Sequence, residues 1–312
     1  MVALLSGGTG GAKLARGLLD VVGSDLTVIA NTGDDVEIYG VHVSPDPDLV
    51  TYWLADAIDE RGYGIRGDTW EVMRALDSTG RPTWFRLGDR DLAMCLVRTE
   101  LLRAGERLTR AHAAVVDAMG VAARVLPMSD EPVRTRVRAR GHWRPFQEFM
   151  IVDRAQGPVE DVRFDGAAEA RPSPEVLGAL AGAAAIVIGP SNPIASIGPI
   201  LALPGMREAI AAAPAPVVAV SPFVGGRAIK GPTEAFAAWA GLGTDSAGVV
   251  RAYAGLLDGL VADEEVELED VASLRTDTLM DTPAARARVA ATILEFAGAL
   301  AHHGRGHAGD AR

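Results

Sequence analysis

The stretch that decides the fold is Val2–Lys13, VALLSGGTGGAK, together with Leu26–Asp35, LTVIANTGDD. Val2–Leu5 is a short apolar run that stops at a series of glycines, which is typical of a buried strand. Leucines at helical spacing follow over 11–22, so we expect a helix there, and Leu26–Ala30 repeats the strand pattern. Strand, glycine loop, helix and strand form a βαβ unit, and continuous apolar strands indicate a parallel sheet covered on both faces.

Two later segments repeat the pattern of an apolar strand followed by a polar loop. Ala184–Gly189 leads into Pro190–Pro193, and Pro216–Ser221 leads into Pro222–Gly226. We therefore predict an α/β protein with a Rossmann-like three-layer domain and a mainly parallel sheet. Ligands of such sheets bind outside the carboxyl ends of the strands, so the loops after the four strands should meet at one site.

The middle of the chain has a different periodicity. Helical spacing of apolar residues marks 49–58, 69–76, 89–103 and 109–119, and the single strand candidate in between is 84–87. We predict a helical insertion over 49–120, which leaves 1–48 and 121–312 as the Rossmann-like domain.

Strand patterns return after residue 121 and predict a small antiparallel element. Strands are expected at 123–126, 133–139 and 146–152, and Val133–Ala139 alternates inward residues with Arg134, Arg136 and Arg138. Further helices are expected after Pro204 and over 233–240, 247–257 and 283–300, followed by a polar tail from 302 to 312 without regular structure.

Composition excludes several classes of protein. The 312 residues include 41 acidic and 30 basic side chains, a net charge of −11, whereas proteins that bind nucleic acid normally carry a basic excess. The single cysteine, Cys95, has no partner for a disulfide, and no apolar run approaches the roughly 20 residues of a membrane span. We expect a cytoplasmic protein that binds neither nucleic acid nor membrane.

The strand-end loops predict a phosphate site. Successive glycines allow backbone amides and a helix N-terminus to approach a phosphate, and a lysine follows them. The loop is neither a Walker A sequence, because Ala12 precedes Lys13, nor a clean dinucleotide fingerprint. A structural turn without ligand is the alternative. The candidate phosphate-binding residues are Gly7, Gly8, Thr9, Gly10, Gly11, Lys13, Ser191, Asn192 and Ser221.

Four acidic residues lie on neighbouring loops and suggest a Mg²⁺ site. Asp34 and Asp35 follow the second strand, and Asp46 and Asp48 stand in the segment SPDPD. Carboxylates together with substrate phosphates are typical Mg²⁺ ligands. Helix capping is the alternative for Asp48, but adjacent like charges at Asp34 and Asp35 need a nearby positive charge.

A third polar group, RLGDRD over 86–91, opens the predicted helix 89–103. Asp89 and Asp91 suit its first turn, whereas Arg86 and Arg90 are candidates for contact with a phosphate or a planar ligand. The six histidines show no metal-ligand spacing.

Taken together, these strings resemble the 2-phospho-L-lactate transferase family, which makes the deazaflavin coenzyme F-420. The similarity covers nearly the whole chain, and the departures from the family pattern are Pro47 and Met150, where relatives carry Leu and Trp. The matching strings are SGGTGGAK (6–13), NTGDD (31–35), SPDPD (44–48), RLGDRDLA (86–93), LPMSDEPV (126–133), FQEF (146–149), GPSNPIASIGPIL (189–201), VSPFVGG (220–226) and RTDTLM (275–280).

The resemblance implies an Mg²⁺-dependent phosphotransferase. A guanosine diphosphate conjugate of lactate or enolpyruvate would react with the ribityl hydroxyl of the deazaflavin Fo, releasing GMP and forming F-420-0 or its dehydro form. By similarity, Asp48 and Arg86 would be catalytic and contact Fo, and Asp34 and Asp48 would hold the metal. The family also implies a homodimer, and the alanine- and arginine-rich composition favours the enolpyruvyl donor.

Two other classes of function compete with this interpretation. A nicotinamide dehydrogenase is disfavoured because the glycine fingerprint is incomplete. A nucleotide-sugar-binding regulator of a related Rossmann-like family shares the glycine loop and the paired aspartates. In this sequence, however, Val36–Tyr39 and then SPDPD follow Asp35, instead of the glycine-serine run of such regulators.

Overall fold

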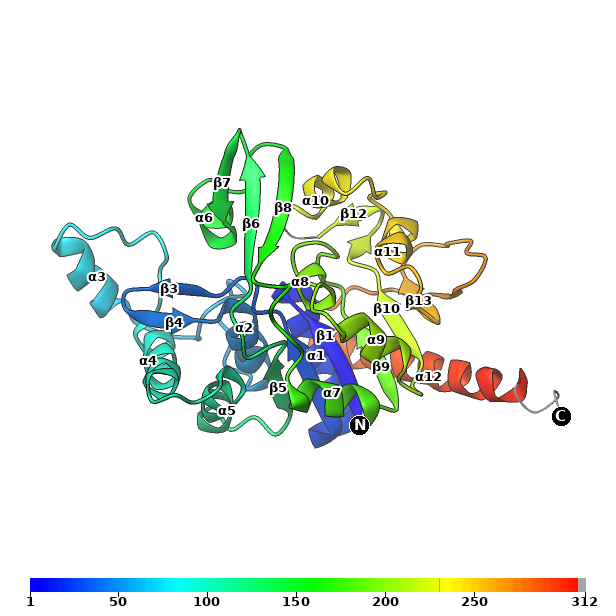
Figure 1. Cartoon of the computed structure of the whole chain (residues 1–312). Helices are drawn as coiled ribbons and strands as arrows, with labels where there is room; N and C mark the ends of the chain where they lie inside the picture. Colours follow the sequence, from blue (N-terminus) through cyan, green and yellow to red (C-terminus); the bar gives the residue numbers. More distant parts are fainter. Residues whose placement is uncertain (230, 308–312) are drawn as a thin grey trace.

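The computed structural model describes residues 1–229 and 231–307; Lys230 and the last five residues of the predicted polar tail lie outside the described residues. A central sheet of seven parallel strands organises the chain (Figure 1). Their order across the sheet is β14 (Ala272–Arg275), β13 (Gly259–Ala262), β10 (Val217–Val220), β9 (Ala185–Ile188), β1 (Val2–Ser6), β2 (Leu26–Ala30) and β5 (Arg124–Pro127).

This strand order is that of a doubly wound Rossmann sheet, and it confirms the predicted fold class. From β1 the chain winds outward through β2 and β5, then returns to the other side of β1 and winds outward again through β9 and β10. The direction of winding reverses between β1 and β9, so their carboxyl ends form the topological switch point where such folds bind ligands.

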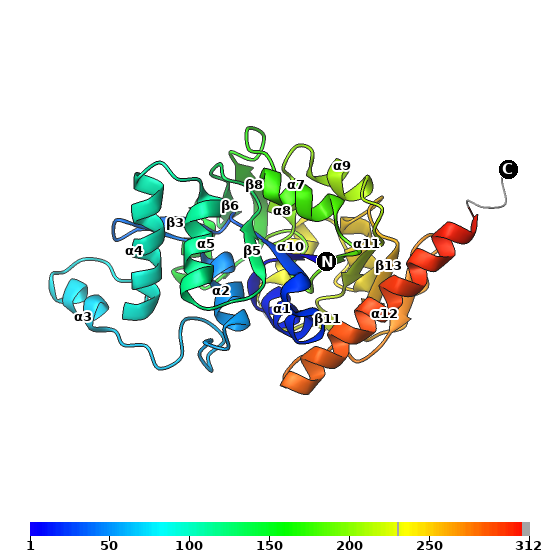
Figure 2. The ribbon, with the colours of Figure 1, turned by 90° about the horizontal axis from the view of Figure 1, so that it is seen from below.

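Helices cover both faces of the sheet (Figure 2). Successive residues of a strand point to opposite faces, and since the central strands are largely apolar, both faces must be buried. Leu4 packs in one apolar layer, and Leu5 packs in the other. The layer of Leu4 contains α1 (Gly8–Val22), α2 (Pro45–Leu54), α5 (Leu108–Ala118) and α12 (Pro283–His307). The layer of Leu5 contains α7 (Pro174–Ala181), α8 (Gly198–Leu201), α9 (Met206–Ala211) and α11 (Ser246–Ala252).

The segment between β2 and β5 is largely helical, as the sequence predicts. It holds the hairpin β3 (Val36–Ile38) and β4 (Val41–Val43), then α2, α3 (Glu71–Ser78), α4 (Asp89–Arg103) and α5. Residues 84–87 do not form a strand; Phe85 and Leu87 instead pack against Val41 and Val43 of the hairpin. The predicted division at 48/49 stays a prediction, although it falls inside α2, which packs against α1.

A three-stranded antiparallel sheet stands above the carboxyl ends of the central strands (Figure 1). It contains β6 (Arg134–Ala139), β7 (His142–Pro145) and β8 (Val159–Asp165), and the predicted burial of Thr135, Val137 and Ala139 is confirmed. Three short elements complete the fold near this sheet and after β10, namely β11 (Phe223–Val224), β12 (Arg227–Ala228) and α10 (Thr233–Trp239).

Two further predictions of secondary structure are wrong. The predicted strand 146–152 is the helix α6 (Phe146–Ile151), because Pro145 caps it and the apolar Phe146, Phe149 and Met150 recur at helical spacing. The predicted tail is helical through His307, since α12 continues past residue 300. Within the described ranges, no helix has the length and apolar character needed to cross a membrane.

Candidate functional site

A cavity of about 420 Å³ opens at the carboxyl ends of β1, β2, β9 and β10. All four strand-end loops contribute to its wall, so the prediction that they converge is confirmed. Of the predicted phosphate-binding residues, Gly11 alone does not line it. The others do, together with Asp34 and Asp46: Gly7, Gly8, Thr9, Gly10, Lys13, Ser191, Asn192 and Ser221.

The glycine loop packs tightly against the loop that follows β9. A Cβ atom at Gly10 would lie 2.1 Å from the carbonyl oxygen of Pro190, and one at Gly7 would lie 2.6 Å from Cβ of Ser196. The Gly7 amide donates to Oγ of Ser191 at 3.2 Å, which joins the two loops across the switch point. These glycines are therefore required by the fold itself, whatever the loop binds.

The N-terminus of α1 points into the cavity with a lysine on its second turn. The first amides of a helix lack intrahelical acceptors and carry partial positive charge, so this end suits a phosphate. Lys13 Nζ lies 3.1 Å from Oδ1 of Asp281, and both residues line the cavity. A phosphate here would compete with Asp281 for the lysine ammonium.

Beside the glycine loop, two buried carboxylates share the side-chain amide of Asn31. Nδ2 of Asn31 donates to Asp34 at 3.1 Å and to Asp46 at 2.9 Å, and the Gly8 amide donates to the other oxygen of Asp46 at 2.7 Å. Burial, together with the charge of Asp46, raises the pKa of Asp34 well above its ordinary value. Burial also raises the pKa of Asp46, to about 6.

This acid pair has the chemistry of a cation site. Neither Asp34 nor Asp46 forms an ion pair with a side chain in the described part of the chain, yet both are at most 7% exposed and line the cavity. Two carboxylates in a buried site repel each other unless a proton or a cation lies between them. A divalent cation that also binds a substrate phosphate would satisfy this constraint.

The other two predicted acidic residues are paired inside the protein. Asp35 accepts hydrogen bonds from Oγ of Ser44 at 2.7 Å and from Nε2 of His42 at 2.9 Å. Asp48 forms a two-pronged ion pair with the guanidinium of Arg98, with N–O distances of 2.6 and 2.7 Å. Neither residue lines the cavity.

Asp48 belongs to a second group with metal-ligating atoms. One ligand atom each of Asp48, Asp91 and Cys95 lies within 4.8 Å of the others. Arg98 already neutralises Asp48, and burial raises the pKa of Asp91 to about 7 and the pKa of the Cys95 thiol well above its usual range. This group therefore suits a buried polar network better than a cation.

Arg86 lies outside the cavity, on the segment between β2 and β5. Its guanidinium stacks over Trp70 at 5.5 Å, and Arg61 stacks over the same ring at 5.2 Å and over Tyr63 at 5.1 Å. Tyr63, Arg61, Trp70 and Arg86 thus form an alternating series of aromatic and guanidinium groups, which we call the stacking series. Arg61 and Tyr63 line the cavity, so the series begins at its wall.

Sequence reasoning missed most of this series. Trp53 and Trp84 do not belong to the series; Trp53 packs against Arg286, and Trp84 packs against Phe85. Trp70 is the N-cap residue of α3 and falls within the predicted helix 69–76, but nothing in the sequence indicates that its ring contacts Arg61 and Arg86. Asn31 stands in the NTGDD string, but nothing in the string indicates that its amide joins two acids.

Fold and site together define a class of protein. A Rossmann-order sheet whose switch point holds a glycine loop, a lysine and a buried acid pair is typical of proteins that bind phosphate-containing small molecules. The comparisons with known proteins refine this class.

Residues 2–292 match the family model of 2-phospho-L-lactate transferase CofD. The chain belongs to this family and is a transferase. It is similar to the phosphoenolpyruvate transferase of Kitasatospora aureofaciens, with 41% identity over 96% of this chain and 99% of that protein. It is also 39% identical to the 2-phospho-L-lactate transferase of Methanosarcina mazei, over 89% of this chain and 94% of that protein.

A solved structure supports the fold alone. A Bacillus halodurans protein superposes with a TM-score of 0.62 over 94% of this chain and 98% of that chain, at 18% sequence identity. The family resemblance seen in the sequence is confirmed, and the regulator and dehydrogenase interpretations are not favoured.

The raised pKa values of the acid pair predict that the stability of the cation-free protein decreases with rising pH, the opposite of the usual effect of a carboxylate with a lowered pKa. A carboxyl group whose pKa is about 6 in the folded state, and near 3.8 otherwise, is protonated only in the folded chain between these values. Stability should therefore fall as pH rises from about 4 to about 6. Asp46→Asn should reduce this fall, which thermal melting in chelator at several pH values would measure. Identical pH dependence in both proteins would contradict the burial of an uncompensated acid pair.

Proposed function

We propose that this protein transfers a phosphoenolpyruvyl group from a guanosine diphosphate conjugate to the terminal ribityl hydroxyl of Fo. The new bond joins the ribityl oxygen to the phosphorus that carries the three-carbon acid. The phosphoanhydride bond to GMP breaks, GMP leaves with the bond's electron pair, and the hydroxyl proton is released. The product is dehydro F-420-0.

One observation carries the proposal: the N-terminus of α1, which suits a phosphate, and an acid pair without a charged partner among the described residues lie side by side in the wall of one cavity, joined by the hydrogen bond from the Gly8 amide to Asp46. Phosphoryl transfer needs positioning and charge neutralisation rather than a covalent nucleophile, and this cavity offers both. The enolpyruvyl donor is supported by relatives such as the phosphoenolpyruvate transferases of Kitasatospora aureofaciens and Streptomyces griseus. The lactyl donor is the alternative, since the Methanosarcina mazei relative is a 2-phospho-L-lactate transferase.

The nucleotide diphosphate would lie on the glycine loop. Backbone amides at the start of α1 would donate to its phosphates, and Lys13 would exchange Asp281 for a phosphate oxygen. Ser191, Asn192 and Ser221 line the same end of the cavity. These groups bind and orient the leaving GMP.

The cation would be Mg²⁺, held by Asp34 and Asp46. The geometry favours Asp46 over Asp48 as the second ligand, because Asp46 faces the cavity and Asp48 is paired with Arg98. When bound, Mg²⁺ would neutralise the charge of the diphosphate. Asn31 would orient both carboxylates toward it.

Fo would lie on the stacking series. Its planar ring suits guanidinium and aromatic faces, and Arg61 and Tyr63 bring that surface to the cavity wall. Arg86 would act through the far end of the series, beside Trp70.

Two broader properties are also proposed. The family implies a homodimer, and both proposed substrates imply a cytoplasmic enzyme; the part of the chain that the structure describes identifies neither. Light scattering at micromolar concentration should give about twice the 32.6 kDa chain mass. A strict monomer would contradict the dimer and leave the transferase proposal intact.

The first functional prediction concerns product and metal. Mass spectrometry should detect dehydro F-420-0 from Fo and the enolpyruvyl conjugate, with slower reaction of the lactyl conjugate. Chelation should abolish turnover, and Asp34→Asn should reduce it at least about 100-fold, the usual scale for a positioned electrostatic group. Glu100→Gln on the exposed side of α4 is the matched control. Full turnover in chelator would refute the role assigned to the acid pair.

Substitutions in the stacking series and at the glycine loop should affect different substrates. Removing one face of a cation–aromatic stack, by Arg86→Ala or Trp70→Ala, should weaken Fo binding about tenfold and leave GDP affinity nearly unchanged. Lys13→Met should do the reverse. Calorimetric titration of both ligands would measure this, with the exposed Arg81→Ala as control. Loss of GDP rather than Fo in Arg86→Ala would invert the placement of the substrates.

A further inference from the structure

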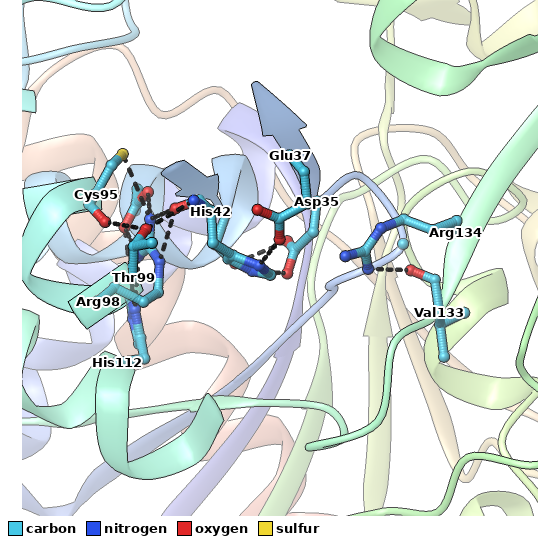
Figure 3. A network of polar contacts seen from close by, with 12 residues as sticks. Asp35, Glu37, His42, Cys95, Arg98, Thr99, His112, Val133 and Arg134 are labelled. Atoms are coloured by element: carbon cyan, nitrogen blue, oxygen red, sulfur yellow. Dashed lines mark hydrogen bonds and ion pairs between the residues drawn. The ribbon is translucent and has the colours of Figure 1, made fainter. Parts of the chain in front are cut away.

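His42, in the middle of β4, is held by the helical segment through its backbone. Its amide donates to Oγ1 of Thr99 at 2.7 Å, and its carbonyl accepts from Nη2 of Arg98 at 3.1 Å and from Nε at 3.3 Å. Both partners lie on α4 and are buried, Arg98 completely. Figure 3 shows His42 between these two residues and the carboxylates of Asp35 and Glu37.

The side chain of His42 reaches the acidic loop. Its Nε2 lies 2.9 Å from Asp35, and its Nδ1 lies 2.5 Å from Glu37. Although burial opposes a charged ring, the hydrogen bond and charge of Asp35 raise the pKa of His42 above its ordinary value. An imidazolium can donate to both carboxylates at once.

Asp35 in turn fixes the backbone around both members of the acid pair. It follows Asp34 directly, and its second oxygen accepts from Ser44, two residues before Asp46. On the other side of Asp34, the Asn31 side chain accepts from the Gly33 amide at 2.8 Å. The spacing between Asp34 and Asp46 therefore depends on Asp35, and Asp35 depends on His42.

We infer that His42, fixed by Arg98 and Thr99, is a positioning residue that sets the affinity of Asp34 and Asp46 for a divalent cation. The inference rests on the cation part of the proposed function and extends it to residues that do not line the cavity. Two carboxylates that repel each other would separate unless their loops are held. Removing a residue that orients a metal ligand commonly weakens metal binding about 10- to 100-fold.

The test compares variants with matched controls on the full chain, with Mn²⁺ as the probe. His42→Leu removes both ring contacts, whereas His42→Gln keeps one donor for Asp35. Thr99→Val removes the hydroxyl that accepts from His42 and donates to Cys95, whereas Thr109→Val changes a buried threonine whose hydroxyl has no partner within the described residues. Free Mn²⁺ is followed by its electron paramagnetic resonance signal, and thermal melting in chelator records stability.

His42→Leu should raise the Mn²⁺ dissociation constant about tenfold or more, and His42→Gln less. Thr99→Val should weaken Mn²⁺ binding, whereas Thr109→Val should leave it at the wild-type value. Fo binding should be unchanged in all four variants, which separates a positioning effect from a damaged fold. An unchanged dissociation constant in His42→Leu, or equal weakening by Thr99→Val and Thr109→Val, would overturn the inference.

Turnover of the wild-type protein keeps the two proposals distinguishable. Metal-dependent transfer together with wild-type Mn²⁺ affinity in His42→Leu would refute the positioning role alone. A wild-type chain that transfers the group in chelator and binds no Mn²⁺ would refute the cation part of the proposed function and this inference with it.

Discussion

The burial of Arg98 is the constraint on which the segment between β2 and β5 depends. A guanidinium removed completely from water is costly unless each donor finds a partner. The guanidinium of Arg98 donates two hydrogen bonds to the carboxylate of Asp48 on α2. It donates two more to the backbone carbonyl of His42 on β4. Breaking such a pair by removing one partner typically costs about 3–5 kcal/mol, so α2, β4 and α4 are fixed relative to one another.

The same arrangement explains why one set of acids is free for a ligand. Asp48 is neutralised by Arg98, and Asp35 faces His42, so their charges are satisfied within the protein. Within the described residues, Asp34 and Asp46 receive only neutral donors, from Asn31 and the Gly8 amide. Asp34 and Asp46 therefore line the cavity without a charged partner among the described residues, and Asp46 contacts the helix N-terminus that suits a phosphate.

Much of the fold follows from the sequence because the apolar strands and glycine loops of a parallel sheet are locally recognisable. Val2–Leu5 and Leu26–Ala30 needed no tertiary information, and the convergence of their loops follows from topology. The segment 146–152 was predicted wrongly because a six-residue helix holds too few turns to distinguish a period of 3.6 from a strand. Pro145 before Phe146 was the missed helix signal.

The different surroundings of Asp46 and Asp48 were not predicted from the sequence. The sequence SPDPD does not distinguish Asp46 from Asp48. In the structure, both residues lie in the first turn of α2. Residues two apart on a helix point roughly 200° apart, so one carboxylate faces the cavity and the other faces Arg98. Read as a loop, SPDPD gives no such distinction. Pro45 at the first helical position would have supported a helix and separated the two acids.

The glycine loop and the stacking series differ in how they are held. The glycine loop follows a strand end, and Gly7 and Gly10 leave no room for a Cβ atom, so its geometry is rigid. The stacking series lies on the irregular segment between α2 and α4, where arginine and aromatic side chains contact one another without a regular backbone ladder. A transfer reaction needs the phosphorus held fixed, whereas an acceptor can enter along an adaptable surface. Under the proposed function, the strand-end loops would hold the phosphorus and the segment between β2 and β5 would present the acceptor.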